Sequence, residues 1–329
     1  MMRSEQVGIV GAGPFGTALA HVVAQAGRPV LIWSQTEPVV AEINDKHQNH
    51  DRLPGVELHP GVEATSSAAE LAERSGFIVL AVGTDDVRDR ARQLGDHLDG
   101  SHIVVHAIGG LAEPLDVPVS VVLDEELPTL RIGALAGPTR VEDLAEGRVS
   151  SAVCASAFDD VTARARELLS SPPVLRLYCS RDLLGVELAS ALAGVYTVAL
   201  GLADGLKVGA GTRAVLTTRS VAEAARLGTA VGADGWTFAG LAGLGNLLVR
   251  GYDQESSVPE YRFGQGLAAG NSDRGSLPVG ARAAHALARM ATSCGLRMPI
   301  LEAVDGILRG TASLKEAAAS LADTVAPLE

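Results

Sequence analysis

The cysteine patterns that stabilise small secreted proteins or bind metals are missing from this chain of 329 residues. Its 3 cysteines, Cys154, Cys179 and Cys294, are scattered along the sequence. They form neither a disulfide framework nor the paired spacing of a metal site. We therefore expect free thiols, no metal ion, and a reducing compartment such as the cytoplasm.

Long hydrophobic runs are lacking as well. No uninterrupted apolar run approaches the ~20 residues that a bilayer-spanning helix needs, and residues 1–6 contain no apolar signal-peptide region. The formal net charge of −12 disfavours nucleic acid and anionic membranes as main partners. We therefore expect a cytoplasmic protein that binds neither nucleic acid nor membrane.

Lysine is scarce. Of the 27 basic residues only Lys46, Lys207 and Lys315 are lysines. Few lysines are therefore available to act as a general base, a role that lysine fills when its pKa is shifted by its surroundings.

A glycine-rich turn follows the apolar run at 7–10. The segment Gly11-Ala12-Gly13-Pro14-Phe15-Gly16 fits the G-x-G-x-x-G pattern, with a strand-like run before it and an Ala-rich helical stretch after it. In this pattern the first glycine allows a tight turn, the second lets a pyrophosphate approach the backbone, and the third lets helix and strand pack closely. The sequence therefore predicts a binding site for NAD or NADP.

The organisation of the chain changes near residue 180. Strand-like runs alternate with helical stretches up to that point, as in a doubly wound α/β domain with a parallel sheet; they fall at 6–10, 29–33, 77–82, 102–107, 131–136, 151–155 and 174–178. Beyond it, helical patterns dominate at 182–203, 212–231, 279–294, 299–309 and 314–323. We predict a Rossmann dinucleotide-binding domain at 1–180 and an all-α substrate domain at 181–329. In the second, 182–203 is the central buried helix and 251–278 is an irregular, mobile loop.

Motifs along nearly the whole chain resemble the bacterial NAD(P)-dependent glycerol-3-phosphate dehydrogenases. They include Gly11–Ala20, Leu53-Pro54-Gly55, Ala136-Gly137-Pro138, Gly185–Leu188, Gly201–Gly205, Gly240–Gly245, Arg262-Phe263-Gly264 and Met298–Val304. The resemblance implies a Rossmann domain followed by a 6-phosphogluconate-dehydrogenase-like all-α domain. It also implies a family reaction that interconverts glycerol 3-phosphate and dihydroxyacetone phosphate.

Several functional positions of that family are substituted here. Gly109 and Ala193 stand where the family has its two lysines, and Gly194 stands where it has an Asn. Asn246 replaces an Asp, and Arg250 or a neighbour replaces a Thr. The phosphate-binding Ser-Arg-Asn falls within Ser257–Glu260, and Arg140 takes the place of an aromatic residue. Loss of a base and of a phosphate clamp is expected to cost several orders of magnitude in the family reaction.

Three residues are candidates for replacing the missing catalytic groups. Tyr196 lies one turn after Ala193 and could donate a proton, Lys207 follows the central helix, and Asn246 can form hydrogen bonds but cannot act as a base. Each also has a structural interpretation, which we prefer: a buried tyrosine, a solvated lysine at a helix end, and an asparagine in a cap or turn. His106, beside the lost lysine position, titrates in a useful range but is more often structural at a strand end.

Three arginines, Arg140, Arg250 and Arg262, are candidates for substrate binding. Together they could bind an anion that differs in size from a triose phosphate. Arg262 is carried over from the family motif, whereas the other two have surface charges as an equal alternative.

The choice of cofactor is left open by the end of the second predicted strand. NAD enzymes usually have a carboxylate there for the ribose 2′-OH, but Ser34-Gln35-Thr36 supplies none, and family members that take NADP often have Arg where Gln35 stands. We expect NAD or NADP as the cofactor. The predicted cofactor-binding residues are Gly11, Gly13, Pro14, Phe15, Gly16, Trp33, Ser34, Gln35, Val82 and Gly83.

Two functional hypotheses follow. The first is an NAD(P)-dependent oxidoreductase of this superfamily with an altered substrate, such as another small ketone, imine or phosphorylated metabolite. The alternative is a catalytically dead dinucleotide-binding protein that acts as a sensor or scaffold. Glycerol-3-phosphate dehydrogenase activity itself ranks third. The expected partners are a small-molecule substrate and a second copy of the chain in a homodimer.

Overall fold

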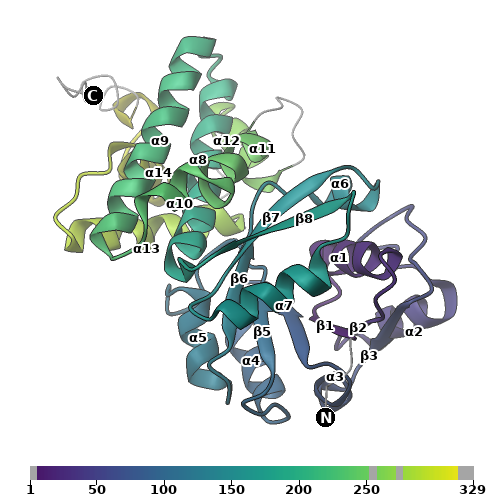
Figure 1. The fold of residues 1–329 in the computed structure, drawn as a ribbon. Helices are drawn as coiled ribbons and strands as arrows, with labels where there is room; N and C mark the ends of the chain where they lie inside the picture. The colour runs from purple at the N-terminus through teal and green to yellow at the C-terminus, as the bar shows by residue number, and fades with distance from the viewer. Residues whose placement is uncertain (1–5, 252–257, 272–276, 318–329) are drawn as a thin grey trace. The chain divides into compact units, whose positions relative to one another are not determined.

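The computed structural model describes residues 6–251, 258–271 and 277–317. It divides the chain into two compact units, Met1–Leu183 and Leu184–Glu329. The first is an α/β unit and the second is helical (Figure 1). The predicted class, a Rossmann-type sheet followed by an all-α domain, is confirmed.

An eight-stranded sheet forms the centre of the N-terminal unit. Its strand order is β3-β2-β1-β4-β5-β6-β7-β8, so the first six strands follow the Rossmann order. The strands are β1 Val7–Val10, β2 Val30–Trp33, β3 Val62–Thr65, β4 Phe77–Leu80, β5 Ile103–His106, β6 Ile132–Ala136, β7 Ser150–Ala155 and β8 Leu175–Ser180.

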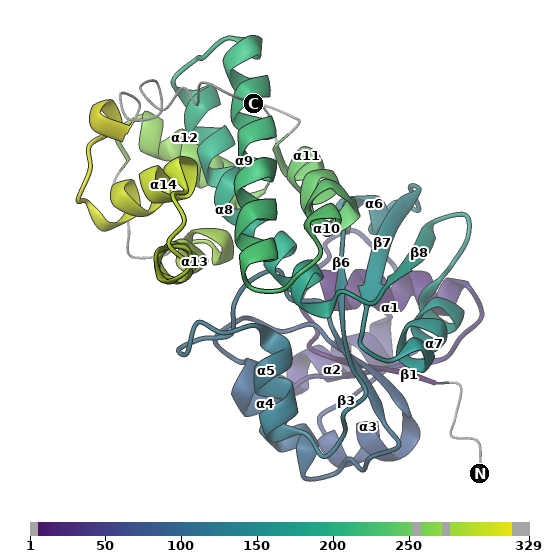
Figure 2. The same ribbon diagram turned by 60° about the vertical axis from the view of Figure 1, so that its left-hand side comes forward.

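Helices cover both faces of this sheet, and strand residues alternate between two apolar clusters. Ile9 and Ile32 face the cluster that includes α1, α2, α6 and α7, whereas Val10 and Leu31 face the one that includes α3, α4 and α5. Figure 2 shows the two layers from a second side. The helices are α1 Pro14–Gln25, α2 Glu37–Lys46, α3 Ala68–Arg74, α4 Val87–Gly95, α5 Val119–Glu126, α6 Val141–Ala145 and α7 Asp159–Leu169.

Two features of the sheet differ from the prediction. β3 was missed because its residues, Val62-Glu63-Ala64-Thr65, include only one large apolar side chain, whereas the other four-residue strands are rich in them, and it lies at the sheet edge. β7 pairs with β6 in antiparallel fashion, whereas we expected parallel strands throughout. The connection between them holds only the five-residue α6, which packs against α1, and so it does not form a helical crossover over the sheet.

The C-terminal unit is built around a long apolar helix, α8 Leu183–Gly205, which matches the predicted central helix. By length and hydropathy α8 is long and apolar enough to cross a membrane, whereas we expected no apolar run to approach that length. However, 89% of its apolar window is buried inside the protein, which is the behaviour of a core helix. The other helices are α9 Ala210–Ala230, α10 Gly235–Ala239, the π-helical η1 Leu241–Gly245, α11 Asn246–Gly251, α12 Pro259–Ala268, α13 Val279–Ser293 and α14 Pro299–Arg309.

We predicted that 251–278 is an irregular loop, but part of this segment is helical. Pro259 at the first helical position begins α12, and Glu260, Tyr261 and Gly264 of that helix are buried. The helix was missed because one proline and two glycines, Pro259, Gly264 and Gly266, interrupt the apolar periodicity there. Residues 252–257 and 272–276 lie outside the described residues, as does most of the predicted helix 314–323, of which 314–317 are helical.

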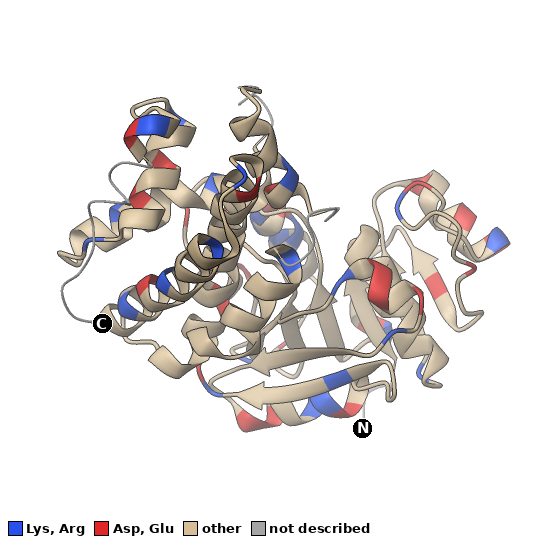
Figure 3. Cartoon of the chain, turned by 90° about the horizontal axis from the view of Figure 1, so that it is seen from above, with Lys and Arg blue, Asp and Glu red and all other residues tan. Residues whose placement is uncertain are grey.

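Charged residues of both signs are interspersed on the helices of both units, and the strands of the sheet carry few of them (Figure 3). The net charge of −12 is thus distributed over many surface helices.

Candidate cofactor pocket and substituted catalytic positions

The turn between β1 and α1 needs glycine at its first and last glycine positions for reasons of packing. Gly11 has a φ of +106°, and a Cβ there would lie 2.4 Å from the carbonyl oxygen of Ala81. A Cβ on Gly16 would lie 2.3 Å from the carbonyl oxygen of Gly11. Both residues therefore fix the path of the backbone at the end of β1.

Gly13, the middle glycine, is different. A Cβ at this position would meet nothing within 4 Å, so the protein itself does not require glycine there. Gly13 is the N-cap of α1, and among the described residues no side chain caps this helix end. The amide groups of the first turn of α1 therefore face open space, where an anion such as a pyrophosphate is favoured.

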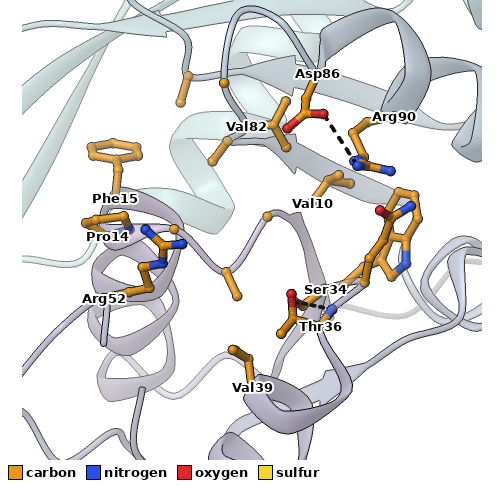
Figure 4. Close-up of a pocket in the computed structure, with 18 of the residues that line it drawn as sticks. Val10, Pro14, Phe15, Ser34, Thr36, Val39, Arg52, Val82, Asp86 and Arg90 are labelled. Atoms are coloured by element: carbon orange, nitrogen blue, oxygen red, sulfur yellow. Dashed lines mark hydrogen bonds and ion pairs between the residues drawn. The ribbon is translucent and has the colours of Figure 1, made fainter. Parts of the chain in front are cut away.

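A cavity of about 600 Å³ opens over this turn (Figure 4). It lies at the carboxyl ends of β1, β2, β4 and β5, beside the point where the strand order reverses, which is where open α/β sheets bind ligands. Of the predicted cofactor-binding residues, all but the buried Gly16 line it: Gly11, Gly13, Pro14, Phe15, Trp33, Ser34, Gln35, Val82 and Gly83. The residues present therefore fit a dinucleotide.

Trp33 lines the cavity at the end of β2, but most of its side chain is buried. Its indole is 4% exposed, belongs to the apolar cluster under α3 and α4, and donates its Nε1–H to the carbonyl of Ser66. The indole therefore packs inside the unit, and the polar groups at the end of β2 are those of the next three residues.

Polar residues that we did not single out also line the cavity, namely Thr36, Asp51, Arg52, Asp86 and Arg90. Arg90 and Asp86, one turn apart on or beside α4, form an ion pair of 3.4 Å. The sequence did not predict Asp86 and Arg90 because they lie some fifty residues after the β2 loop. No spacing rule links the start of α4 with that loop.

The C-terminal unit holds the two adjacent α8 positions, Ala193 and Gly194, where the resemblance implies Lys and Asn. Ala193 is 3% exposed and Gly194 is buried. A Cβ on Gly194 would lie 2.9 Å from the Cα of Gly280 and 3.6 Å from Nη1 of Arg250. Helices α8 and α13 thus touch through two glycines, and this contact leaves no room for a larger residue at 194.

A chain of polar contacts crosses the same unit. The Asn246 amide donates to the Ser190 hydroxyl at 3.3 Å and accepts from Nε of Arg250 at 3.1 Å. Arg250 forms an ion pair with Glu260 at 3.5 Å, and Glu260 accepts the backbone N–H of Gly280 at 3.1 Å. We call Ser190, Asn246, Arg250 and Glu260 the Arg250 network.

Comparisons with known proteins place both units in one family. The family model for the NAD-dependent glycerol-3-phosphate dehydrogenase N-terminus matches residues 6–162, and that for the C-terminus matches residues 182–319. The chain belongs to the NAD-dependent glycerol-3-phosphate dehydrogenase family.

Relatives of the family match along nearly their whole length. The chain is 34% identical over 322 residues to a glycerol-3-phosphate dehydrogenase [NAD(P)+] of Parvibaculum lavamentivorans, covering 96% of both chains. It is 35% identical over 311 residues to the enzyme of that name from Thermobifida fusca, covering 91% of both. Among solved structures, a glycerol-3-phosphate dehydrogenase from Coxiella burnetii superposes with a TM-score of 0.88 at 26% identity, covering 97% of this chain and 99% of that one.

Of the three candidate catalytic residues in this family member, Tyr196 is deeply buried. Its hydroxyl is within hydrogen-bond distance (3.3 Å) of the Glu223 carboxylate, and burial raises the pKa of the phenol well above its ordinary value. Glu223 also accepts the backbone N–H groups of Ile300 and Leu301 at the start of α14. This arrangement ties α8 and α9 to α14 and gives Tyr196 a structural role, which speaks against proton donation to a substrate.

The other two candidates differ in burial. Lys207 lies just beyond α8 in a left-handed conformation and is exposed, as are Lys46 and Lys315. Asn246 is 5% exposed and belongs to the Arg250 network at the start of α11. All three lysines of the chain thus lie on the surface, and none is desolvated.

The three candidate substrate arginines lie on separate elements. Arg140 precedes α6 in the N-terminal unit and lies 3.4 Å from Glu142. Arg250 belongs to α11, and Arg262 is exposed on α12. In the N-terminal unit, His106 ends β5 and accepts the N–H of Ile108, and Gly109 follows in the loop beyond. Among the described residues no cluster of His, Cys, Asp and Glu could hold a metal ion.

Proposed function

We propose that this chain is an NAD(P)-dependent oxidoreductase whose substrate is a small metabolite other than glycerol 3-phosphate. The relatives named above are glycerol-3-phosphate dehydrogenases that use NAD(P)+. The observation that carries the proposal is the contrast between the two units. The β1–α1 turn under the cofactor cavity keeps every glycine of the fingerprint, whereas the α8 positions of the family Lys and Asn are Ala193 and Gly194.

The lysines support a change in chemistry. A base that removes the proton of an alcohol must lie at the reacting hydroxyl, and burial tunes its pKa for that task. Since Lys46, Lys207 and Lys315 are all exposed, none is in the environment that such a base requires. The proton must therefore come from another group or from water, which favours a substrate that is easier to reduce than a triose phosphate.

The Arg250 network supports a different ligand. Arg250 stands at or next to the position of a family Thr, and Glu260 lies in the region of the family's phosphate-binding Ser-Arg-Asn, of which Ser257 lies outside the described residues. The Glu260 carboxylate repels a phosphate. It also pairs with Arg250 at 3.5 Å, so the positive charge of Arg250 is neutralised and attracts a phosphate less strongly. We infer that this unit binds a smaller or less highly charged substrate than glycerol 3-phosphate.

When bound, the nicotinamide cofactor would supply or accept a hydride. This chain's own residues would bind and orient it. The backbone N–H groups in the first turn of α1, of which Pro14 supplies none, would hold the pyrophosphate, and Pro14 and Phe15 would line the same stretch of the cavity.

The test is a binding titration followed by a substrate panel. NADH and NADPH are titrated into the purified chain by fluorescence, and small ketones, 2-oxo acids and cyclic imines are then offered with the reduced cofactor. We expect saturable binding and reduction of at least one compound at a rate well above that with dihydroxyacetone phosphate. Failure of both cofactors to bind at millimolar concentration would contradict the proposal.

A binding-only role is the second candidate, and the contact between Gly194 and Gly280 favours it. This contact fills the place of the family Asn with packed backbone, so the unit has lost space as well as reactive groups. The chain would then bind a dinucleotide as a sensor or scaffold. Reduction of any compound in the panel would exclude this role, whereas cofactor binding without any turnover would support it.

A further inference from the structure

We propose that the chain prefers NADP over NAD and that Arg90 is the residue that binds the 2′-phosphate. This inference rests on the proposed function, since it concerns the cofactor of the same cavity. It adds a residue on α4, outside the fingerprint, to the groups that select the cofactor.

The first step is the absence of a carboxylate on the β2 loop. An enzyme that selects NAD uses an Asp or Glu at the end of the second strand to accept the ribose 2′-OH, and this carboxylate repels a 2′-phosphate. Here Ser34, Gln35 and Thr36 line the cavity at that point, and the next acidic residue, Glu37, is not part of the lining. Nothing on this loop therefore excludes a phosphate.

The second step is the position of Arg90. The Gln35 side chain donates from Nε2 to Oε1 of Gln93 at 2.7 Å, and Arg90 donates from Nη1 to the same oxygen atom at 3.1 Å. A single oxygen atom thus holds the guanidinium of Arg90 beside the side chain of Gln35. The positive charge that the β2 loop lacks comes from α4 instead.

The third step is the hydrogen-bonding capacity of this guanidinium. Its Nη2 atom lies 3.4 Å from the Asp86 carboxylate, and the side chain is 20% exposed, so it is oriented but reachable from the cavity (Figure 4). A guanidinium has five N–H donors, and contacts with Gln93 and Asp86 account for two of them. Phosphate binding can therefore add to these contacts without breaking them.

Asp86 is the competing explanation, because its carboxylate also lines the cavity and is a chemical match for a ribose hydroxyl. However, it precedes α4 and does not lie on the β2 loop, and one of its two carboxylate oxygens, Oδ1, pairs with Arg90. The charged group held beside the side chain of Gln35 is therefore the guanidinium of Arg90.

The test is a titration of the purified chain with NADPH, NADH, adenosine 2′,5′-bisphosphate and adenosine 5′-monophosphate. We expect NADPH to bind roughly tenfold to a hundredfold more tightly than NADH, since a charge-assisted contact to phosphate is gained. The bisphosphate should exceed the monophosphate by a similar factor. Equal affinities, or tighter binding of NADH, would overturn the inference, while binding of neither dinucleotide would overturn the proposed function itself.

Variants assign the effect to its residue. Arg90→Gln should lower the affinity for NADPH by roughly tenfold or more and the affinity for NADH by a much smaller factor, so that the preference is lost. Gln35→Asp should reverse the preference. Arg92→Gln is the matched control, because Arg92 belongs to the same helix but is paired with Glu126 and does not line the cavity. If Arg90→Gln keeps the preference, or if Arg52→Gln removes it instead, Arg90 is not the 2′-phosphate ligand.

Discussion

Glycines allow backbone segments to approach closely in both units, but with opposite effects on the space around them. In the N-terminal unit, the fingerprint glycines keep the β1–α1 turn tight and leave the space next to Gly13 open. In the C-terminal unit, Gly194 and Gly280 use the same lack of side chains to bring α8 and α13 together, which fills space. A site made of backbone groups persists as long as the turn persists, whereas a site made of side chains can be rebuilt by a few substitutions on an unchanged fold.

The largest effect that separates the units is expected from Gly13→Val. Its side chain would project into the space where the pyrophosphate binds, so we expect dinucleotide affinity to fall by roughly a hundredfold or more, about 2.7 kcal/mol. Unfolding in urea should change little, because a Cβ at Gly13 meets nothing within 4 Å.

The matched control for this variant is Gly209→Val. Gly209 is the N-cap of α9, has a similar extended conformation with φ −70° and ψ 159°, and also has nothing within 4 Å. Dinucleotide titrations of both variants distinguish a local block from a general effect of valine at an N-cap. Equal affinities of the two variants would contradict the placement of the pyrophosphate.

In the C-terminal unit, Gly194→Asn should destabilise the protein even though the family resemblance implies Asn at this position. The new Cβ would lie 2.9 Å from the Cα of Gly280, and overpacking of this kind costs about 2–3 kcal/mol. Urea unfolding measures the loss, with Gly211→Asn on the exposed side of α9 as the control. A stable Gly194→Asn variant would show that α8 and α13 separate easily and would weaken the contrast between the units.

A smaller effect is expected from Glu260→Gln. The variant breaks the ion pair with Arg250, in which the Glu260 side chain is 8% exposed. The amide oxygen of the new glutamine can still accept the N–H of Gly280. We expect a loss of about 1–2 kcal/mol in the free energy of unfolding. Glu142→Gln, which removes the more exposed pair with Arg140, should change stability by less than about 0.5 kcal/mol. Similar losses for both variants would mean that the Arg250 network is no more than a surface pair.

The smallest effect concerns pH and Glu223. Burial raises the pKa of its carboxyl above the usual 4.5, against the lowering effect of the Ile300 and Leu301 amides. The folded state therefore binds more protons than the unfolded state above pH 4.5, so stability falls as the pH rises from there through the raised pKa and is level beyond it. Raising the pKa of a carboxyl by one on folding changes the free energy of unfolding by about 1.4 kcal/mol across this window.

Glu223→Gln tests this contribution, because the amide oxygen can still accept a backbone N–H and the group no longer titrates. We expect the stability of the variant relative to the original chain to increase with pH over the same window, as measured by urea unfolding at a series of pH values. A difference between the two that is independent of pH would show that Glu223 keeps its ordinary pKa in the folded chain.

The sequence predicted the parts of the fold and site that depend on local pattern. The spacing of Gly11, Gly13 and Gly16 predicted both the turn and the cavity above it, because each glycine has a fixed task within a few residues. The apolar composition of 182–203 predicted a buried central helix. β3 was missed because it has only one large apolar side chain, and α12 was missed because proline and glycines interrupt its apolar pattern.

Contacts between distant segments could not be predicted. Arg90 lies beside the β2 loop because it shares the Gln93 side chain as a hydrogen-bond acceptor with Gln35. Arg250 and Glu260 form an ion pair although ten positions separate them in the sequence. The sequence also gave no indication that Gly194 is packed against Gly280. Such pairings depend on how helices are placed in three dimensions, which no single-sequence spacing encodes.

The most direct test of the contrast between the units is one experiment on two proteins. This chain and the Parvibaculum lavamentivorans relative are each saturated with NADPH, with binding verified by fluorescence, and the oxidation of NADPH is followed after addition of dihydroxyacetone phosphate. We predict that both proteins bind the cofactor and that this chain turns over at least roughly a thousandfold more slowly. Turnover within about tenfold of the relative would contradict the account, because the substituted positions would then still support the family reaction.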